Sequence, residues 1–190
     1  MTSGTRGNTD KLVDVTVTVR RATTTDATGL ADLAEVTFPL ACPPGSAPEA
    51  IADYIATHLT AERFGDYLAD AGRILTVAED DAGLCGYTML LTADTADEDV
   101  AAALGIRPTI ELSKVYVLPG SHGLGVAAPL MQATLDAARS TGAAGIWLGV
   151  NQRNPRALRF YEKSGFSIVG EKTFSLGPEL HHDFVMERAL

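Results

Sequence analysis

Several informative kinds of residue are scarce in this chain. Only two of its 190 residues are cysteines, Cys42 and Cys85, and their separation fits neither a metal site nor a CxxC redox motif. We therefore expect reduced thiols and no bound metal. No apolar run approaches the roughly 20 residues of a membrane-spanning helix, and residues 1–11 lack the apolar segment of a secretory signal. These absences predict a cytoplasmic protein with no membrane partner.

Positive charge is also scarce. The chain has 15 lysines and arginines against 24 acidic residues, which gives a net charge of −9. This balance argues against nucleic acid as a partner and is compatible with a cationic substrate. Polar residues 1–13 are predicted to form a disordered N-terminal tail. Residues 14–190 are long enough for one domain with a sizeable core.

Strand and helix patterns follow one another along this domain. Strands are predicted at 15–20, 74–78, 84–92, from Glu111 onwards, and at 146–150, 166–170 and 183–188. Helices are predicted at 27–38, from Pro48, at about 61–71, at 124–138 and between Asn154 and Gly165. Residues 39–47 are expected to form a loop because they are rich in proline, and 94–99 an acidic surface linker. The pattern predicts an α/β or α+β domain, a mixed sheet with helices on its faces.

A glycine-rich turn at 119–125 joins the strand that begins at Glu111 to the helix at 124–138. The helix therefore begins with several unpaired backbone N–H groups, and its dipole adds partial positive charge there. Such an end is suited to binding phosphate. Pro129 lies inside this helix and removes one backbone hydrogen bond. We therefore expect a kink, or a first turn that starts late, near Val126.

Two motifs carry a family resemblance. The glycine turn reads His122-Gly123-Leu124-Gly125-Val126-Ala127, and a second motif, Asn-x-x-Ala-x-x-x-Tyr-x-x-x-Gly-Phe, consists of Asn154, Ala157, Tyr161, Gly165 and Phe166. In their order and separation they resemble the GNAT superfamily of acetyl-CoA-dependent N-acetyltransferases. His122 stands where that family has Arg or Gln, and Gly149 where some members carry a glutamate. Residues 19–27, the run 146–150 and the closing residues 183–186 are similar to those of the PaiA-type spermidine/spermine acetyltransferases.

The resemblance implies a single domain with the GNAT fold and acetyl-CoA as co-substrate. In that fold the amides of the glycine turn bind the pyrophosphate of coenzyme A, and pantetheine pairs with the fourth strand where a bulge separates it from the fifth. Asn154 has two candidate roles, as the N-cap of its helix and as a contact of the cofactor. The residues expected to bind acetyl-CoA are Val115, Tyr116, Val117, His122, Gly123, Leu124, Gly125, Val126, Ala127 and Asn154.

Two residues are candidates for catalysis. Tyr161 is the candidate general acid, because a phenol with a pKa of about 10 stays protonated and can donate to a thiolate with a pKa near about 8.5. Its alternative role is that of a core aromatic. Glu111 lies near the place where many family members have a catalytic carboxylate, and could accept the proton of the amine through water. Its alternative role is that of a solvated residue at a strand start. His181 and His182 are expected to be exposed before the last strand.

The predicted function is transfer of acetyl from acetyl-CoA to a primary amine of a small molecule, a polyamine first, by direct attack in a ternary complex. A protein N-terminus, an antibiotic or an amino acid is the alternative acceptor. A non-catalytic acyl-CoA-binding regulatory module is a third hypothesis, which stays open because His122 replaces the Arg or Gln of the family. A Rossmann dinucleotide site also fits the glycine spacing, but the next strand ends L-G-V-N without the acidic residue that site needs. A homodimer and a monomer both stay open.

Overall fold

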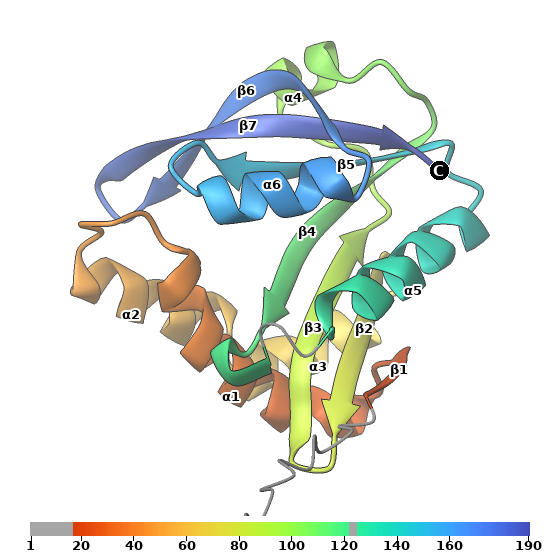
Figure 1. Cartoon of the computed structure of the whole chain (residues 1–190). Coiled ribbons are helices and arrows are strands. Elements are labelled where there is room, and N and C mark those ends of the chain that lie inside the picture. The colour runs from red at the N-terminus through yellow and green to blue at the C-terminus, as the bar shows by residue number, and fades with distance from the viewer. Residues whose placement is uncertain (1–16, 122–124) are drawn as a thin grey trace, which may run out of the picture.

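The computed structural model describes residues 17–121 and 125–190, and within them one mixed sheet runs through the molecule (Figure 1). Its strands are β1 Thr18–Arg21, β2 Arg73–Asp80, β3 Gly83–Leu91, β4 Thr109–Val117, β5 Gly145–Asn151, β6 Ser167–Leu176 and β7 Glu179–Ala189. Their order across the sheet is β1-β2-β3-β4-β5-β7-β6. Only β4 and β5 pair in parallel; the other pairs are antiparallel. The predicted mixed sheet in a single domain is confirmed.

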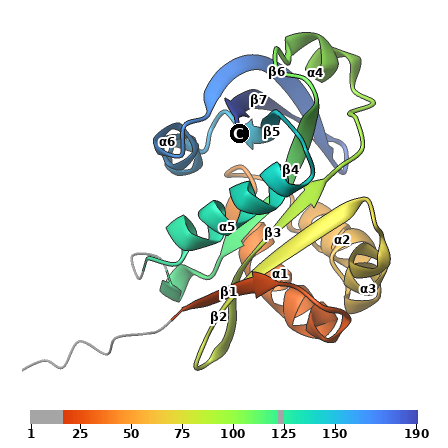
Figure 2. The same cartoon turned by 90° about the vertical axis from the view of Figure 1, so that its right-hand side faces the viewer.

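Helices cover both faces of the sheet. They are α1 Ala27–Ala41, α2 Pro48–His58, α3 Ala61–Ala69, α4 Glu98–Ala103, α5 Ala127–Ser140 and α6 Pro155–Lys163, with short 3-10 turns at Thr24–Asp26 and Pro119–Ser121. Figure 2 shows α5 on one side of β2 and β3 and α1 to α3 on the other. No helix of these described segments is long and apolar enough to cross a membrane.

Alternating side chains of the strands supply two main hydrophobic clusters. On one face, Leu75 and Tyr87 pack with Leu30 of α1 and Phe64 of α3. On the other face, apolar residues of β4 and β5 pack against α5. The alternation follows from the strand geometry, because successive side chains point to opposite faces. Both faces of the central strands are therefore buried, as expected for a sheet between two layers of helices.

Some predicted element bounds were wrong. Helix α1 continues through Pro39 to Ala41, so the loop begins at Cys42 and not at residue 39. Near the end of a helix proline removes only one backbone bond, and continuing the turn keeps Phe38 buried and stacked on Tyr54, with ring centroids 4.5 Å apart. The acidic stretch 94–99 ends in a helix, α4, whose first amides are capped by Asp97. Strand β4 begins at Thr109, two residues before Glu111.

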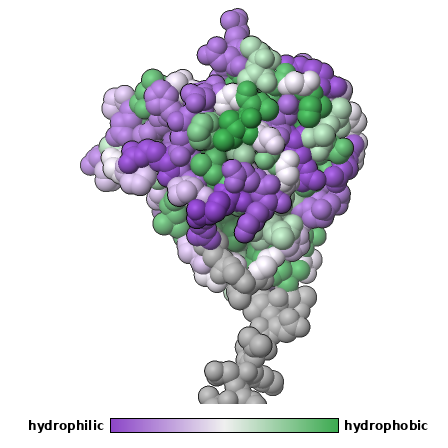
Figure 3. All heavy atoms as spheres, turned by 45° about the horizontal axis from the view of Figure 1, so that its top comes forward, coloured by the Kyte–Doolittle hydropathy of each residue, from purple (hydrophilic) through white to green (hydrophobic). Residues whose placement is uncertain are grey.

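The closing hairpin is longer than predicted. Strands β6 and β7 extend over 167–176 and 179–189, so His181 and His182 lie within β7 and not before it. The alternation there is hard to read from the sequence because most side chains of β6 are exposed or half-buried. Apolar side chains gather on the face of the molecule shown in Figure 3. Ile168 and Val169 of β6 are exposed.

Candidate active site

One extra residue in β4 shapes the site. Lys114 pairs with Met89 and Leu112 pairs with Leu90, so Ser113 has no partner in β3 and forms a bulge. Leu112 and Val115 both pack in the cluster under α5, although three positions separate them. The bulge thus shifts the alternation by one residue. As a result Glu111, Lys114 and Tyr116 all line the pocket on the other face.

The same region is where the sheet opens. β4 pairs with β5 only from Thr109 to Glu111, opposite Gly145 to Trp147. Beyond Glu111 the two strands separate, and in Figure 1 β4 runs away from β5 below their shared end. A pocket of about 330 Å³ lies at this opening. β4, β5, α6, the end of α1 and the β6–β7 hairpin all contribute to its walls.

Glu111 lies among cations in this pocket. Burial raises the pKa of Glu111, and the positive charges of Lys172, Lys114 and Arg73 offset part of that rise. Burial lowers the pKa of Lys114 to about 8, against the stabilising effect of Glu111. Neither lysine lies within ion-pair distance of a carboxylate anywhere in the described segments. The pocket therefore contains a carboxyl group whose proton affinity is increased, as a general base requires.

Gly149 and Lys172 form a second polar feature of the pocket. A Cβ atom on Gly149 would lie 3.3 Å from Cδ of Lys172 and 3.6 Å from Oδ2 of Asp183. The missing side chain at Gly149 thus leaves space for Lys172 to cross β5. Its ammonium lies 5.7 Å from the centroid of the Trp147 ring. Asp183 accepts a hydrogen bond of 3.2 Å from Nδ2 of Asn151, and burial raises the pKa of Asp183.

Sequence reasoning missed Lys114, Lys172 and Asp183 as residues of the site. Lys114 could have been found, because the apolar alternation changes phase between Leu112 and Val115 and so places Lys114 on the same face as Glu111. Lys172 and Asp183 are neighbours across β6 and β7, and nothing local in the sequence pairs these strands with the pocket. Only the tertiary arrangement brings them to Glu111.

Tyr161 lies on α6 and lines the pocket. Its ring contacts Phe160 and Phe166 edge to face, with centroid distances of 5.4 and 5.9 Å. Burial raises the pKa of Tyr161, so the phenol stays protonated at neutral pH. α6 is held in place by Asn154, whose Oδ1 accepts a 3.0 Å hydrogen bond from the amide of Ala157. The predicted capping role of Asn154 is confirmed, and Asn154 also lines the pocket.

The glycine turn is described only in part. His122, Gly123 and Leu124, three of the predicted cofactor contacts, lie outside the described residues. Gly125 has a φ of +79°, a value that glycine adopts without strain. Helix α5 begins at Ala127, so Pro129 is its third residue, where a backbone N–H has no intrahelical partner. The predicted late start is confirmed, and it explains why the proline is tolerated.

The remaining predicted cofactor contacts lie in two places, at the pocket and near the start of α5. Val115 and Tyr116 line the pocket. Val117 packs instead with Val126, the residue before α5, and Leu130. Ala127 is the first residue of the helix. β4 ends at Val117 and α5 begins at Ala127, and the role of these residues in binding the donor stays a prediction.

Comparison with known proteins decides the family. The model of the acetyltransferase (GNAT) family matches residues 33–166 of this chain. The chain belongs to this family. An N-acetyltransferase of Mycobacterium tuberculosis whose activity is uncharacterized is 48% identical to this GNAT chain over 166 residues, covering 87% of the chain and 99% of the relative. The streptothricin acetyltransferase of Streptomyces lavendulae is 35% identical over 82 residues, 40% of this chain and 42% of that protein.

A solved structure shares the GNAT fold. The PaiA N-acetyltransferase of Thermoplasma acidophilum, in complex with coenzyme A, superposes with a TM-score of 0.73. It is 18% identical in sequence, and the match covers 92% of this chain and 99% of that one. The predicted family and fold are confirmed, and the chain is an N-acetyltransferase, an acyltransferase enzyme.

Proposed function

We propose that this GNAT enzyme transfers the acetyl group of acetyl-CoA to a primary amine of a small molecule, by direct attack in a ternary complex. The observation that carries the proposal is the pocket where β4 and β5 separate, because Glu111 and Tyr161 line it from different elements. One is a carboxyl group with increased proton affinity and the other a phenol that stays protonated. They are the base and the acid that the reaction needs.

The reaction uses these two groups at different atoms. A primary ammonium has a pKa near about 10, so it must lose a proton before its nitrogen can attack. Glu111 accepts that proton, through water. The nitrogen then bonds to the thioester carbonyl carbon, releases its second proton to water, and the carbon–sulfur bond breaks. Tyr161 donates its proton to the leaving thiolate of coenzyme A and later regains one from water, so that an amide and a thiol are the products.

Acetyl-CoA fits the described geometry as the donor. Backbone groups of Val115 and Tyr116 lie on the part of β4 beyond its pairing with β5, where an extended pantetheine can pair with them. Residues 122–127 with the start of α5 are the proposed pyrophosphate site, and Asn154 the proposed contact at the pocket. The complex of the PaiA neighbour with coenzyme A supports this donor.

Two observations about the acceptor point in different directions. The net charge of −9 favours a polyamine through long-range attraction. Lys114 and Lys172 in the pocket oppose a second positive charge close to Glu111. The name of the Streptomyces lavendulae relative adds streptothricin to the acceptors worth testing.

The test is a binding measurement followed by an activity screen. Acetyl-CoA binding to the purified chain is measured by calorimetry, and thiol release is then followed with spermidine, amino acids, streptothricin and an N-terminal peptide. We expect binding in the micromolar range and thiol release that is matched by N-acetylated product for at least one amine. Binding without turnover on any amine would overturn the proposed function.

A further inference from the structure

We propose that the acceptor carries an anionic group, a carboxylate first, beside its primary amine, and that Lys172 binds this group. The inference deepens the proposed function and rests on it. It assigns Lys172 as a specificity-determining residue of the acceptor site. Glu111 receives the amine of the same molecule, and Lys172 orients the molecule through the neighbouring anion.

The first step is the position of Lys172. It reaches the pocket from β6, where its neighbour across the hairpin is Asp183. Its side chain passes over β5 at Gly149, where a Cβ built on the glycine would lie 3.3 Å from Cδ of the lysine. A Cβ at residue 149 would be in tight contact with the lysine, which would have to shift by a few tenths of an ångström. Gly149 therefore leaves room for the side chain of Lys172, which lines the pocket together with Glu111.

The second step is the lack of a partner for this charge. Within residues 17–121 and 125–190 no carboxylate oxygen lies within 4.0 Å of the Lys172 ammonium. The ammonium acts on Glu111 and Asp183 only from beyond ion-pair distance, and it lies 5.7 Å from the centroid of the Trp147 ring, at the weak edge of the range for such a contact. A half-buried ammonium is stabilised better by an anion than by a ring. A ligand anion would supply that partner.

The third step concerns the carboxylates of the pocket. Asp183 already has a partner, because Asn151 donates to its Oδ1 at 3.2 Å. The carboxylate of Glu111 has neither a hydrogen bond nor an ion pair with the residues that the structure describes. It is therefore the carboxyl group that is free to receive an ammonium.

The fourth step excludes an acceptor with only positive charges. Lys114 lies near Glu111, half-buried and also without an ion-pair partner in the described segments. A polyamine would bring its second ammonium into a pocket that already holds two lysines, and like charges repel there more than in water. An amino acid or another amino-carboxylate would bring one charge of each sign, which matches the pocket.

The experiment compares matched acceptors that differ only in the anion. Phenylalanine is paired with its amide and with phenethylamine, methionine is paired with its amide, and spermidine is included. We expect kcat/KM of the wild-type enzyme to be at least 10-fold higher for the carboxylate of each pair. An aminophosphonate added to the set shows whether the site accepts an oxyanion other than a carboxylate. Equal rates within the pairs, or a preference for spermidine, would overturn the inference.

Variants assign the preference to Lys172. Lys172→Met is expected to lower the ratio of carboxylate to amide kcat/KM at least 10-fold, mainly through KM of the carboxylate, and Lys172→Arg to retain most of it. Lys172→Glu should shift the preference toward spermidine. Arg139→Gln, an equal change of charge at an exposed position of α5, is the control and should keep the wild-type ratio. A ratio unchanged in all Lys172 variants would contradict the assignment.

The two proposals fail in different ways. Absence of turnover with every amine would overturn the proposed function and with it this inference. Turnover with the same kcat/KM for acceptors with and without the anionic group would overturn this inference alone. Melting temperature and acetyl-CoA affinity are measured for each variant, because a specificity residue should change neither. The comparison of matched acceptors uses the wild-type enzyme only, so it decides the question even if a variant fails to fold.

Discussion

At the scale of single residues, the site depends on Ser113, which has no partner in the neighbouring strand. Without this bulge, strict alternation would put Glu111 and Lys114 on opposite faces of the sheet. With it, both line the pocket, and each changes the proton affinity of the other. The bulge therefore does two things at once, since it places the proposed base and surrounds it with cations.

The first prediction concerns Glu111. The pKa of its carboxyl is raised, so activity should rise with pH as Glu111 loses its proton and becomes able to accept one from the amine. Glu111→Gln should lower kcat/KM by roughly 100-fold or more and abolish this acidic limb. Lys114→Gln removes a cation that lowers the same pKa, so the limb should move to higher pH. The test is the pH dependence of kcat/KM, measured in the steady state for the wild type, Glu111→Gln and Lys114→Gln.

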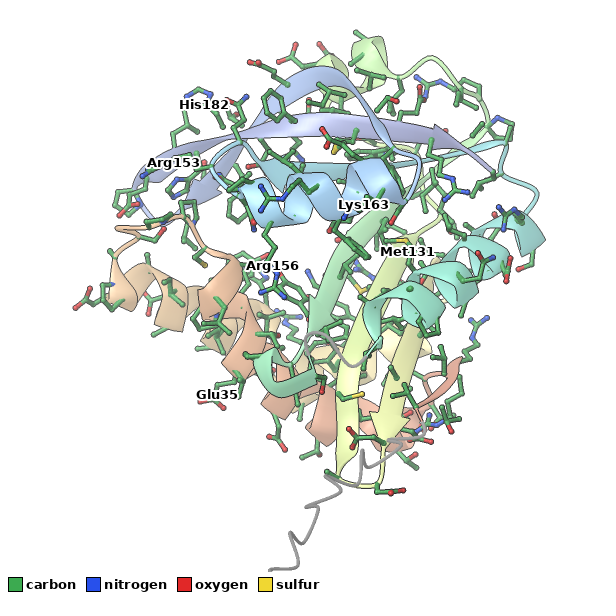
Figure 4. The ribbon with its side chains drawn as sticks, in the orientation of Figure 1. Glu35, Met131, Arg153, Arg156, Lys163 and His182 are labelled. Carbon is green, nitrogen blue, oxygen red and sulfur yellow. The ribbon has the colours of Figure 1, made fainter. Side chains whose placement is uncertain are left out.

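Glu35→Gln is the control for this prediction. Glu35 is exposed on α1 and points away from β4 and β5 in Figure 4, so its loss should leave the profile unchanged. A normal profile in the Glu111→Gln enzyme would count against the role of base.

The second prediction concerns Tyr161. Tyr161→Phe removes only the hydroxyl and keeps the ring packed against Phe160 and Phe166. We expect kcat to fall by roughly 10- to 100-fold, because the thiolate then leaves without a proton donor. The melting temperature should stay close to that of the wild type. Tyr67→Phe, which removes a hydroxyl on α3, is the matched control. Unchanged turnover in Tyr161→Phe would assign the residue to packing alone.

Whether a residue of the site could be predicted depends on how far apart in the sequence the residues that fix its position lie. Asn154 and Tyr161 belong to one helix, and cap, proline and spacing together predict both positions before any tertiary contact is known. Glu111 was found through the family and not through the strand pattern. Lys172 was not found, because its role depends on the empty position at Gly149, on another strand.

At the scale of elements, an ion network fixes the start of the domain. The Arg20 guanidinium on β1 donates to both oxygens of Asp26, at 2.8 and 2.9 Å, and to both oxygens of Glu79 on β2. Asp26 also accepts from the amide of Thr23 at 2.7 Å. The guanidinium therefore ties an edge strand to its neighbour and to the turn before α1. This side-chain arrangement leaves no trace in hydrophobic periodicity.

The third prediction tests this network. The Arg20 guanidinium lowers the pKa of Asp26 to about 2, from a usual value of 3.8. A lowered folded-state pKa stabilises the protein above about pH 4, and this contribution is lost as the pH falls from about 4 to 2. Asp26 is buried and Arg20 half-exposed, so Asp26→Asn should cost ~1–2 kcal/mol at neutral pH, a drop of a few degrees in melting temperature.

The pH dependence identifies the cause. Melting temperatures of the wild type and Asp26→Asn should converge as the pH falls toward about 2. Asp66→Asn removes one partner of an exposed pair with Arg63, and is expected to change stability by less than about 0.5 kcal/mol. Parallel curves for the wild type and Asp26→Asn across this pH range would show that the ion pair is not the cause.

The elements that could be predicted are those with local sequence signals. Elements whose bounds depend on pairing with distant strands could not be predicted in full. The helix at Pro155–Lys163 has cap, proline and terminal glycine signals in the sequence itself. The full lengths of β6 and β7 follow from pairing with each other and with β5, and α4 from a cap at Asp97 inside a stretch that is otherwise acidic. Local signals thus predicted helix positions better than strand ends.

At the scale of the whole molecule, the charge is distributed unevenly. The net charge of −9 disfavours a polyanion such as coenzyme A. The segment 153–163 is the exception, because it is basic with Glu162 as its one acidic residue. Its four basic residues are exposed and form no ion pair within the described part of the chain: Arg153, Arg156, Arg159 and Lys163. Figures 1 and 2 both show α6 above α5, across from its N-terminal half.

The fourth prediction follows from this distribution. In Figure 4, Arg156 and Lys163 extend from α6 toward the side on which α5 lies. Arg156→Gln should weaken acetyl-CoA binding by roughly 3- to 10-fold at low salt, because a cation near the phosphates is lost, and should reduce the salt dependence of the affinity. Calorimetry at about 50 and 300 mM salt measures both effects. Arg63→Gln makes the same change of charge on α3 and should behave as the wild type. If all three proteins share one affinity and one salt dependence, α6 has no part in attracting the donor, and the glycine turn with the N-terminus of α5 must hold its phosphates without help from these cations.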